Sequence, residues 1–176
     1  MRVFPHFLCM NKLVVLSGVP GSGKSYFSRT LKKIKGSHVY VVSSDEIRAQ
    51  ICGIQSDLSK DNIMWPMYYK LADVYSSDPD GMVILDSTNA TTYYRTVPTK
   101  ELKNKFDEVY LIVFKLDRAI VLNQNLQREF PIPTDALEGL IDRFEMPNEE
   151  DEKFFDKIWI VESNDIVPVI NILTTK

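Results

Sequence analysis

The sequence predicts an α/β domain in which helices cover both faces of a mainly parallel sheet. Short apolar stretches alternate with segments of helical periodicity along the whole chain, as in strand–helix–strand units. The strand candidates are apolar at consecutive positions, which is typical of strands covered on both faces. The chain has 176 residues, of which 44% are hydrophobic and 26% charged, and this composition suits one globular domain.

The first elements follow from apolar periodicity and from the placement of glycine. Lys12–Ser17 is a largely apolar run, so we expect the first strand there. Residues 22–34 carry apolar side chains at helical spacing, and Gly36 follows them as a stop signal. Val39–Ser43 predicts a second strand because it is rich in valine, and residues 45–52 predict a short helix after it.

The middle of the chain continues the alternation. Residues 62–76 predict a longer helix with one apolar side, and Pro66 must lie in its first turn or kink it. Met82–Asp86 predicts the third strand. Residues 93–103 predict another helix, which Pro98 can divide.

The last elements are one long strand, two helices and a final strand. Residues 108–115 predict the longest strand, and residues 119–128 predict a helix. Thr134 is a suitable N-cap for a helix over residues 135–144. Lys157–Val161 predicts the last strand, so helical segments separate all five strands.

The ends of the chain carry weaker signals. The acidic run at residues 149–152 predicts a solvated loop, and residues 166–172 predict an edge strand that Pro168 would blunt. We interpret residues 1–11 as an N-terminal extension and residues 162–176 as a C-terminal extension of a single domain.

Composition excludes several classes of protein. No apolar run approaches the ~18–20 residues of a membrane span. Cys9 and Cys52 are too few for a metal cage or a disulfide framework, and the first ten residues are too weakly apolar for a secretory signal. We therefore expect a cytoplasmic protein with no membrane association, and the sequence gives no sign of an obligate protein partner.

Charge is divided unevenly along the chain. Residues 1–128 carry 17 Lys+Arg against 12 Asp+Glu, and residues 129–176 carry 4 against 12. The net charge of −3 therefore comes from the C-terminal quarter. A polyanionic partner is not excluded, because the longer N-terminal part is basic.

One motif stands out between the first strand and the first helix. Residues 18–25, GVPGSGKS, fit the pattern Gly-x4-Gly-Lys-Ser, in which backbone N–H groups cradle phosphates. Lys24 would reach the β- and γ-phosphates of ATP, and Ser25 would offer its hydroxyl to Mg²⁺. A strand precedes the motif and a helix follows it, which favours phosphate binding over a glycine-rich turn without function. The predicted ATP-binding residues are Gly18, Pro20, Gly21, Ser22, Gly23, Lys24 and Ser25. The fold class is then a P-loop NTPase three-layer αβα sandwich with a small lid.

The residues around the motif favour group transfer over hydrolysis. The Asn-Lys-x-Asp guanine reader of GTPases is missing, because Asn11-Lys12 continues as Leu-Val and precedes the motif. Motor ATPases place a water-activating Glu after the aspartate that ends the third strand. Here Asp86 is followed by Ser87, Thr88 and Asn89. Both absences point to a transferase that keeps water out.

Polar side chains follow the second and third strands, at the edge of the sheet where ligands bind. Asp45 could accept a proton from the acceptor, and Arg48 could hold an anionic group. The alternative is that Asp45 only caps a helix and Arg48 is solvated. Asp86 could bind Mg²⁺ through water or orient the acceptor, and Thr88 and Asn89 could position phosphate or acceptor, or serve as N-caps.

A further arginine closes the helix predicted at residues 119–128. Kinases often carry such arginines on a mobile lid, where they stabilise charge on the transferring phosphoryl group. Arg128 is the candidate in this chain, within a lid expected at about residues 124–134. The alternative is a cation that merely stabilises a helix C-terminus.

Together these segments resemble the polynucleotide 5′-kinase branch of the P-loop kinases, from about residue 12 to residue 161. The motifs that carry the resemblance are GVPGSGKS, SSDEIR, GMVILDSTN with the later Arg95, QREFPIP, and TDALEGLIDRFEMPNEED followed by FDKIWIV. The resemblance implies that Lys24 and Ser25 bind ATP and Mg²⁺ and that Asp45 is the general base. It also implies that Arg48 holds a phosphate of the acceptor and that Arg128 is the lid arginine. Arg95 joins the predicted acceptor-binding residues.

Two departures from that family matter. Relatives commonly carry Arg-Asn-x-x-Arg on the lid helix, whereas Gln124 occupies the first arginine position here. The chain also lacks an Asp-x-Asp-x-Thr motif and has no room for an attached phosphatase or ligase domain, so we expect a stand-alone kinase.

Three functions remain open. The leading hypothesis is ATP-dependent phosphorylation of the 5′-hydroxyl end of DNA, RNA or a nucleotide. The second is a small-molecule kinase of the same fold, which the acidic net charge supports. The third is a regulatory nucleotide-binding module with little turnover, suggested by Gln124. Trp65, Tyr68 and Tyr69 could stack on bases, but their helical spacing favours packing.

Overall fold

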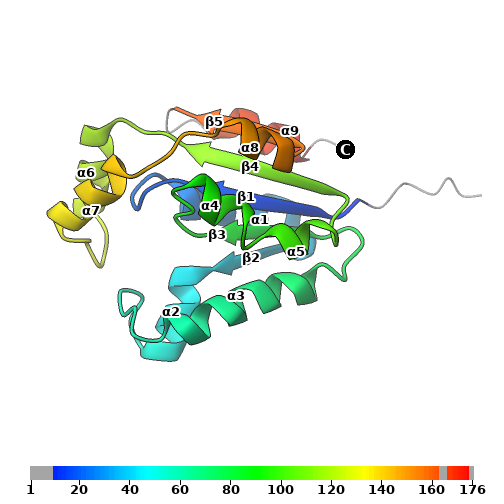
Figure 1. Ribbon diagram of the computed structural model, residues 1–176, viewed down its shortest axis with the longest axis horizontal. Helices are drawn as coiled ribbons and strands as arrows, with labels where there is room; N and C mark the ends of the chain where they lie inside the picture. Colours follow the sequence, from blue (N-terminus) through cyan, green and yellow to red (C-terminus); the bar gives the residue numbers. More distant parts are fainter. Residues whose placement is uncertain (1–9, 163–165, 175–176) are drawn as a thin grey trace, which may run out of the picture.

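The computed structural model describes residues 10–162 and 166–174, and Figure 1 shows their arrangement. A five-stranded sheet forms the centre, with the strand order β2-β3-β1-β4-β5 and parallel pairing throughout. The strands are β1 (Lys12–Ser17), β2 (Val39–Ser43), β3 (Met82–Asp86), β4 (Glu108–Phe114) and β5 (Lys157–Val161). All five strands were predicted, and only β4 ends one residue earlier than expected.

The register of the strands brings the ends of three segments together. Lys12 pairs with both Met82 and Glu108, so β1 lies between β3 and β4. Ser43, the last residue of β2, pairs with Asp86, the last residue of β3. The loops that follow β1, β2 and β3 therefore leave the sheet at the same edge, which is where α/β folds bind ligands.

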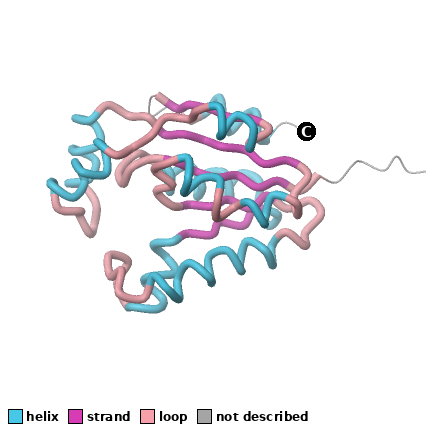
Figure 2. Tube along the Cα trace, in the orientation of Figure 1, coloured by secondary structure: helices cyan, strands magenta, loops and turns pink. Residues whose placement is uncertain are grey.

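Helices cover both faces of the sheet (Figures 1 and 2). Helix α1 follows β1, the long α3 runs beside β2, and α6 and α7 lie beyond the carboxyl ends of the strands. The helices are α1 (Lys24–Lys35), α2 (Ser44–Cys52), α3 (Asp61–Tyr75), α4 (Thr92–Thr96), α5 (Lys100–Lys103), α6 (Arg118–Leu126), α7 (Thr134–Asp142), α8 (Glu149–Phe154) and α9 (Val167–Thr174), with a short 3₁₀ turn at Gly36–His38. This arrangement confirms the three-layer α/β prediction.

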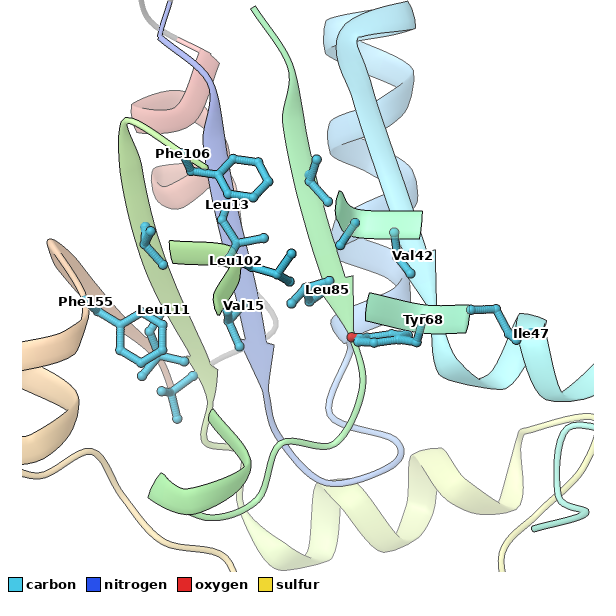
Figure 3. Close-up of a cluster of buried hydrophobic side chains, with 14 of the residues drawn as sticks. Leu13, Val15, Val42, Ile47, Tyr68, Leu85, Leu102, Phe106, Leu111 and Phe155 are labelled. Carbon is cyan, nitrogen blue, oxygen red and sulfur yellow. The ribbon is translucent and has the colours of Figure 1, made fainter. Parts of the chain in front are cut away.

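Alternate residues of each central strand feed two separate cores. On one face, Leu13 and Val15 of β1 contact side chains of α3 and α5, including Tyr68 and Leu102 (Figure 3). On the other face, their neighbours along β1 pack against α1 and α9. Both faces of the sheet are shielded from solvent at β1, because the side chains of residues 13–16 are fully buried. The rigid sheet that results holds the loops at its edge in place.

Pro66 and Pro98 lie within helices predicted from the sequence, and their effects differ. Pro98 does divide the predicted helix, since α4 ends at Thr96 and α5 begins at Lys100. Pro66 lies inside α3 rather than in its first turn, and the helix continues through it.

The C-terminal region differs from the sequence predictions. The expected edge strand at residues 166–172 is wrong: this segment is helix α9, in which Val169, Ile170 and Leu173 are buried. Those three apolar residues recur at helical spacing, and the proline stands in the first turn, where its missing N–H costs nothing. Thr134 is the first residue of α7, whose N-cap is Pro133.

The acidic run was also predicted wrongly, as a loop. It is helix α8, which a capping box starts: the Asn148 side chain accepts from backbone N–H groups, and the Asp151 carboxylate accepts from the N–H of Asn148. No helix in the described ranges is long and apolar enough to cross a membrane.

Candidate active site

The glycine-rich loop at residues 18–25 is held against two other parts of the molecule. The N–H of Gly18 donates to the carbonyl of Thr88 after β3, at 2.9 Å. Gly21 has a φ of 84°, and a Cβ atom there would lie 3.1 Å from the Val121 carbonyl of α6. Only glycine combines that backbone conformation with so close an approach.

The rest of the loop fits a phosphate cradle. Gly23 adopts a left-handed conformation with a φ of 95° and stands at the N-cap of α1. The Ser22 hydroxyl is buried and finds no hydrogen-bond partner among the described residues. Pro20 is partly buried and Ser25 is exposed on the first turn of α1. An unsatisfied hydroxyl beside a helix N-terminus suits a bound anion, which supports the assignment of nucleotide phosphates to this loop.

Lys24 is buried and points back onto the loop that it follows. Its Nζ donates to the carbonyls of Gly18 at 2.7 Å and Val19 at 3.0 Å. Burial lowers the pKa of Lys24 to about 8, and the charges of Asp86 and Asp45 only partly oppose that effect. A bound polyanion would supply the negative charge that this ammonium group lacks.

Asp86 ends β3 directly beside α1. Its Oδ2 accepts a hydrogen bond from Ser28 Oγ at 3.2 Å. Burial raises the pKa of Asp86, while the charge of Lys24 and hydrogen bonds from Ser25 and Ser28 lower it in part. The carboxylate of Asp86 and the hydroxyl of Ser25 are hard oxygen ligands in reach of each other. They fit Mg²⁺, which commonly binds one or two protein oxygens together with phosphates and water.

Thr88 and Asn89 anchor the edge of the sheet. The Asn89 amide donates to the carbonyl of Leu16 at 2.8 Å, and the Asn89 carbonyl accepts from Ser17 Oγ at 2.7 Å. Asn89 also has a positive φ of 41°, a conformation that Asn tolerates better than most residues. With Thr88 bonded to the glycine-rich loop, these residues fix the loop geometry, and their contact with phosphate or acceptor stays a prediction.

Asp45 stands at the start of α2, half exposed, with two arginines beside it. The helix cap is Ser43, whose hydroxyl accepts from the N–H of Glu46 at 3.3 Å, so Asp45 is not needed as a cap. Its Oδ1 lies 3.2 Å from Arg48 Nη1 and its Oδ2 lies 3.8 Å from Arg128 Nη2. The carboxylate is thus available to a ligand and faces cations from two different segments.

Arg48 is a nearly buried residue and not a solvated one, with 9% of its surface exposed. Its guanidinium binds both oxygens of Asp61 at the first residue of α3, with Nε at 2.7 Å and Nη2 at 3.2 Å. The ring of Trp65 lies 5.6 Å from the guanidinium carbon. Asp61 was not predicted as a site residue, because nothing in the sequence links it to Arg48.

Arg128 lies in the segment between α6 and α7, which Asn125 shapes. The Asn125 amide donates to the carbonyl of Ile132 at 2.8 Å and its oxygen accepts from the N–H of Ile132 at 3.1 Å. Below this turn Val19, Val121 and Leu137 form a small buried cluster. The helices that flank the predicted lid therefore pack against Val19 of the glycine-rich loop, and Arg128 between them lies beside Asp45.

Arg95 occupies a different environment from the other predicted site residues. It is completely buried, and its guanidinium binds both oxygens of Asp151 at 2.8 Å, the Thr92 hydroxyl at 3.0 Å and the Glu145 carbonyl at 2.8 Å. These contacts join α4 to α8 and to the chain that returns from the lid. They describe a structural residue, with no surface left for a substrate. The spacing of Asn148 and Asp151 could have revealed Asp151 as a helix-capping residue, but not as the partner of Arg95.

Comparisons with known proteins agree with the fold. A family model described as an AAA domain matches residues 13–147. Kti12 of Chaetomium thermophilum, solved with ADP-AlF3, is 19% identical with a TM-score of 0.64, covering 90% of this chain and 93% of its own. A gluconokinase of Sinorhizobium meliloti 1021 is 18% identical with a TM-score of 0.56, covering 90% and 86%.

A fungal RNA kinase is also similar in structure. It is 15% identical with a TM-score of 0.64, and the match covers 93% of this chain but only 42% of that protein. At these identities the likeness establishes the fold alone. Since the family model spans most of the sheet, the glycine-rich loop and the predicted lid, the chain belongs to the AAA domain family and has a P-loop kinase-like fold.

Proposed function

We propose that this protein transfers the γ-phosphate of ATP to an alcohol, and that the alcohol is the 5′-hydroxyl of a polynucleotide or nucleotide. One observation carries the proposal. Lys24, Asp86, Asp45 and Arg128 come from four separate segments, and the fold brings them together at the carboxyl edge of the sheet. A phosphotransferase site needs a cation that binds phosphate and a carboxylate that binds the metal. It also needs a carboxylate that accepts the proton of the hydroxyl and a second cation on the lid.

Each side chain has a defined task in such a transfer. Asp45 accepts the proton of the acceptor hydroxyl. The oxygen of that hydroxyl forms a bond to the γ-phosphorus of ATP, and the bond between the γ-phosphorus and the bridging oxygen breaks, so that ADP leaves. Lys24 binds phosphate oxygens, and Arg128 stabilises the charge on the group in transit. Ser25 and Asp86 would hold Mg²⁺, which neutralises phosphate charge when it is bound.

The polynucleotide acceptor rests on the position of Arg48. This arginine lies next to Asp45, so an acceptor whose hydroxyl meets Asp45 can place a neighbouring phosphate on the guanidinium. The similarity to a fungal RNA kinase supports the same acceptor class. Tyr68 is buried in the core (Figure 3), so its ring is not exposed for stacking on a base of the acceptor.

A small-molecule kinase is the second candidate. The gluconokinase and a shikimate kinase of Acinetobacter baumannii share the fold over nearly the same length of chain as the RNA kinase. The net charge of −3 suits a compact acceptor as well as a nucleic-acid end.

A panel of acceptors separates the two. Wild-type protein is incubated with labelled ATP, Mg²⁺ and, in parallel, a 5′-hydroxyl oligonucleotide, nucleosides, gluconate and shikimate. We expect label on the oligonucleotide, with acceptor binding that weakens steeply as salt increases. If only gluconate or shikimate becomes labelled, the result would favour the small-molecule kinase instead. ATP binding without transfer to any acceptor would indicate the regulatory module.

A further inference from the structure

Asp61 and Arg48 form a bidentate pair beside the proposed base. The carboxylate of Asp61 accepts from Nε at 2.7 Å and from Nη2 at 3.2 Å, so it occupies one edge of the guanidinium. The side chain of Arg48 is 10% exposed and that of Asp61 is 30% exposed. A bidentate contact with so little exposure to solvent fixes the plane of the guanidinium as well as its position.

The hydrogen bonds of Arg48 can be counted. A guanidinium has five N–H groups, of which Asp61 takes two and Asp45 takes one, through Nη1 at 3.2 Å. One N–H on Nη1 and one on Nη2 stay available in the described part of the chain. These two can bind an acidic oxygen of an acceptor without disturbing the pair with Asp61.

Helix α3 restrains Arg48 from a second direction. Trp65 stands one helical turn after Asp61, and its ring lies 5.6 Å from the guanidinium carbon. One helix thus supplies both a carboxylate at the edge and an aromatic ring near the same group. Because a long arginine side chain loses much rotamer freedom on binding, fixing it beforehand favours acceptor affinity.

Asp45 and Asp61 both contact the guanidinium of Arg48. Asp45 is the other carboxylate in contact with Arg48, and without Asp61 the guanidinium would be left with Asp45 as its carboxylate partner. We propose that Asp61 is a positioning residue, which presents Arg48 to a phosphate of the acceptor and keeps it from pairing fully with Asp45. This inference rests on the proposed function.

The test compares two acceptors that differ in one group, adenosine and adenosine 3′-monophosphate, each with a free 5′-hydroxyl. In Asp61→Asn we expect KM for the 3′-monophosphate to rise about tenfold, while kcat changes less than about threefold. KM for adenosine should stay nearly constant, since it carries no phosphate for Arg48. Asp57→Asn, in the segment between α2 and α3, is the matched control for the loss of one negative charge.

Two further variants separate positioning from folding. In an Arg48→Ala background, Asp61→Asn should have no additional effect, because the residue through which it acts is gone. Asp61→Glu should recover part of the preference for the 3′-monophosphate. Equal losses on both acceptors, or an unchanged preference in Asp61→Asn, would overturn the inference alone. No transfer by wild type to either acceptor or to a 5′-hydroxyl oligonucleotide would overturn the proposed function and this inference with it.

Discussion

Arg128, between α6 and α7, lies with its Nη2 3.8 Å from Oδ2 of Asp45 at the start of α2. The two residues are far apart in sequence, and the contact links the lid to the side of the site assigned to the acceptor. With 24% of the Arg128 side chain and 47% of the Asp45 side chain exposed, the pair is open to water. Such pairs are weak and screened by salt, so Arg128 can leave Asp45 for a phosphate at little cost.

The first prediction concerns this arginine. Arg128→Ala should lower kcat by about 10³–10⁵-fold, because an arginine on the transferring group stabilises the transition state more than the ground state. The dissociation constant of ATP should change little. Both are measured by steady-state kinetics and by equilibrium titration. An equal loss of ATP affinity would place Arg128 in ground-state binding instead.

Asp45 gives the second prediction. Asp45→Asn keeps the size of the side chain but cannot accept a proton, so kcat should fall by about 10²–10⁴-fold. ATP binding should persist, since the nucleotide contacts are assigned to other residues. Glu46→Gln, an exposed neighbour on the same helix, is the control. Undiminished transfer by Asp45→Asn would exclude Asp45 as the base.

The lowered pKa of Lys24 predicts a proton linked to nucleotide binding. With a pKa of about 8, this lysine is half neutral at pH 8 in the free protein. Bound phosphates raise that pKa, so binding at pH 8 should take up about half a proton, and binding at pH 6.5 almost none at this group. Calorimetry in two buffers of different ionisation enthalpy measures the uptake.

Lys24→Arg is the control for that proton, because an arginine stays charged across this pH range. The variant should show no uptake at pH 8 that depends on the side chain at this position. An uptake of the same size in the variant would assign the proton to another group.

The pair of Arg95 and Asp151 predicts a large effect on stability. Both side chains are completely buried, so Arg95→Ala would leave an unpaired carboxylate and should lower the free energy of unfolding by about 3–5 kcal/mol. Arg118→Ala, which removes an exposed arginine paired with Glu138 and Asp142, should cost less than about 1 kcal/mol. Denaturant unfolding of both variants makes the comparison, and similar losses would contradict the structural role of Arg95.

Much of this fold could be predicted because its signals are local. Each strand is a dense apolar run, and the glycine-rich loop needs residues that few other structures require. The C-terminal segment was harder to predict. Over so short a stretch, the apolar residues of α9 fit both the period of a helix and the period of a strand. Its burial against α1 decides the outcome, and that contact is tertiary.

The candidate site was predictable to a similar degree and for a similar reason. Asp86 is the last residue of β3, Asp45 lies two residues after β2, and Lys24 follows the glycine-rich loop after β1, so the topology of a parallel sheet places them at the same edge. Asp61 and Asp151 could not be assigned in this way. Each is recognised by its pairing with an arginine from another helix, and no sequence spacing encodes that pairing.

Helices α2 and α3 hold Asp45, Arg48, Asp61 and Trp65 within one continuous stretch of chain, between β2 and β3. The residues assigned to the nucleotide lie on other segments: the glycine-rich loop, the end of β3 and the lid. Under the proposed function, an exchange of residues 44–75 for the corresponding stretch of another kinase would replace these four residues together with the core side chains of α2 and α3, and it would leave the glycine-rich loop and Asp86 unchanged. Under the proposed function, the acceptor residues can therefore be changed in the laboratory without replacing any residue assigned to ATP.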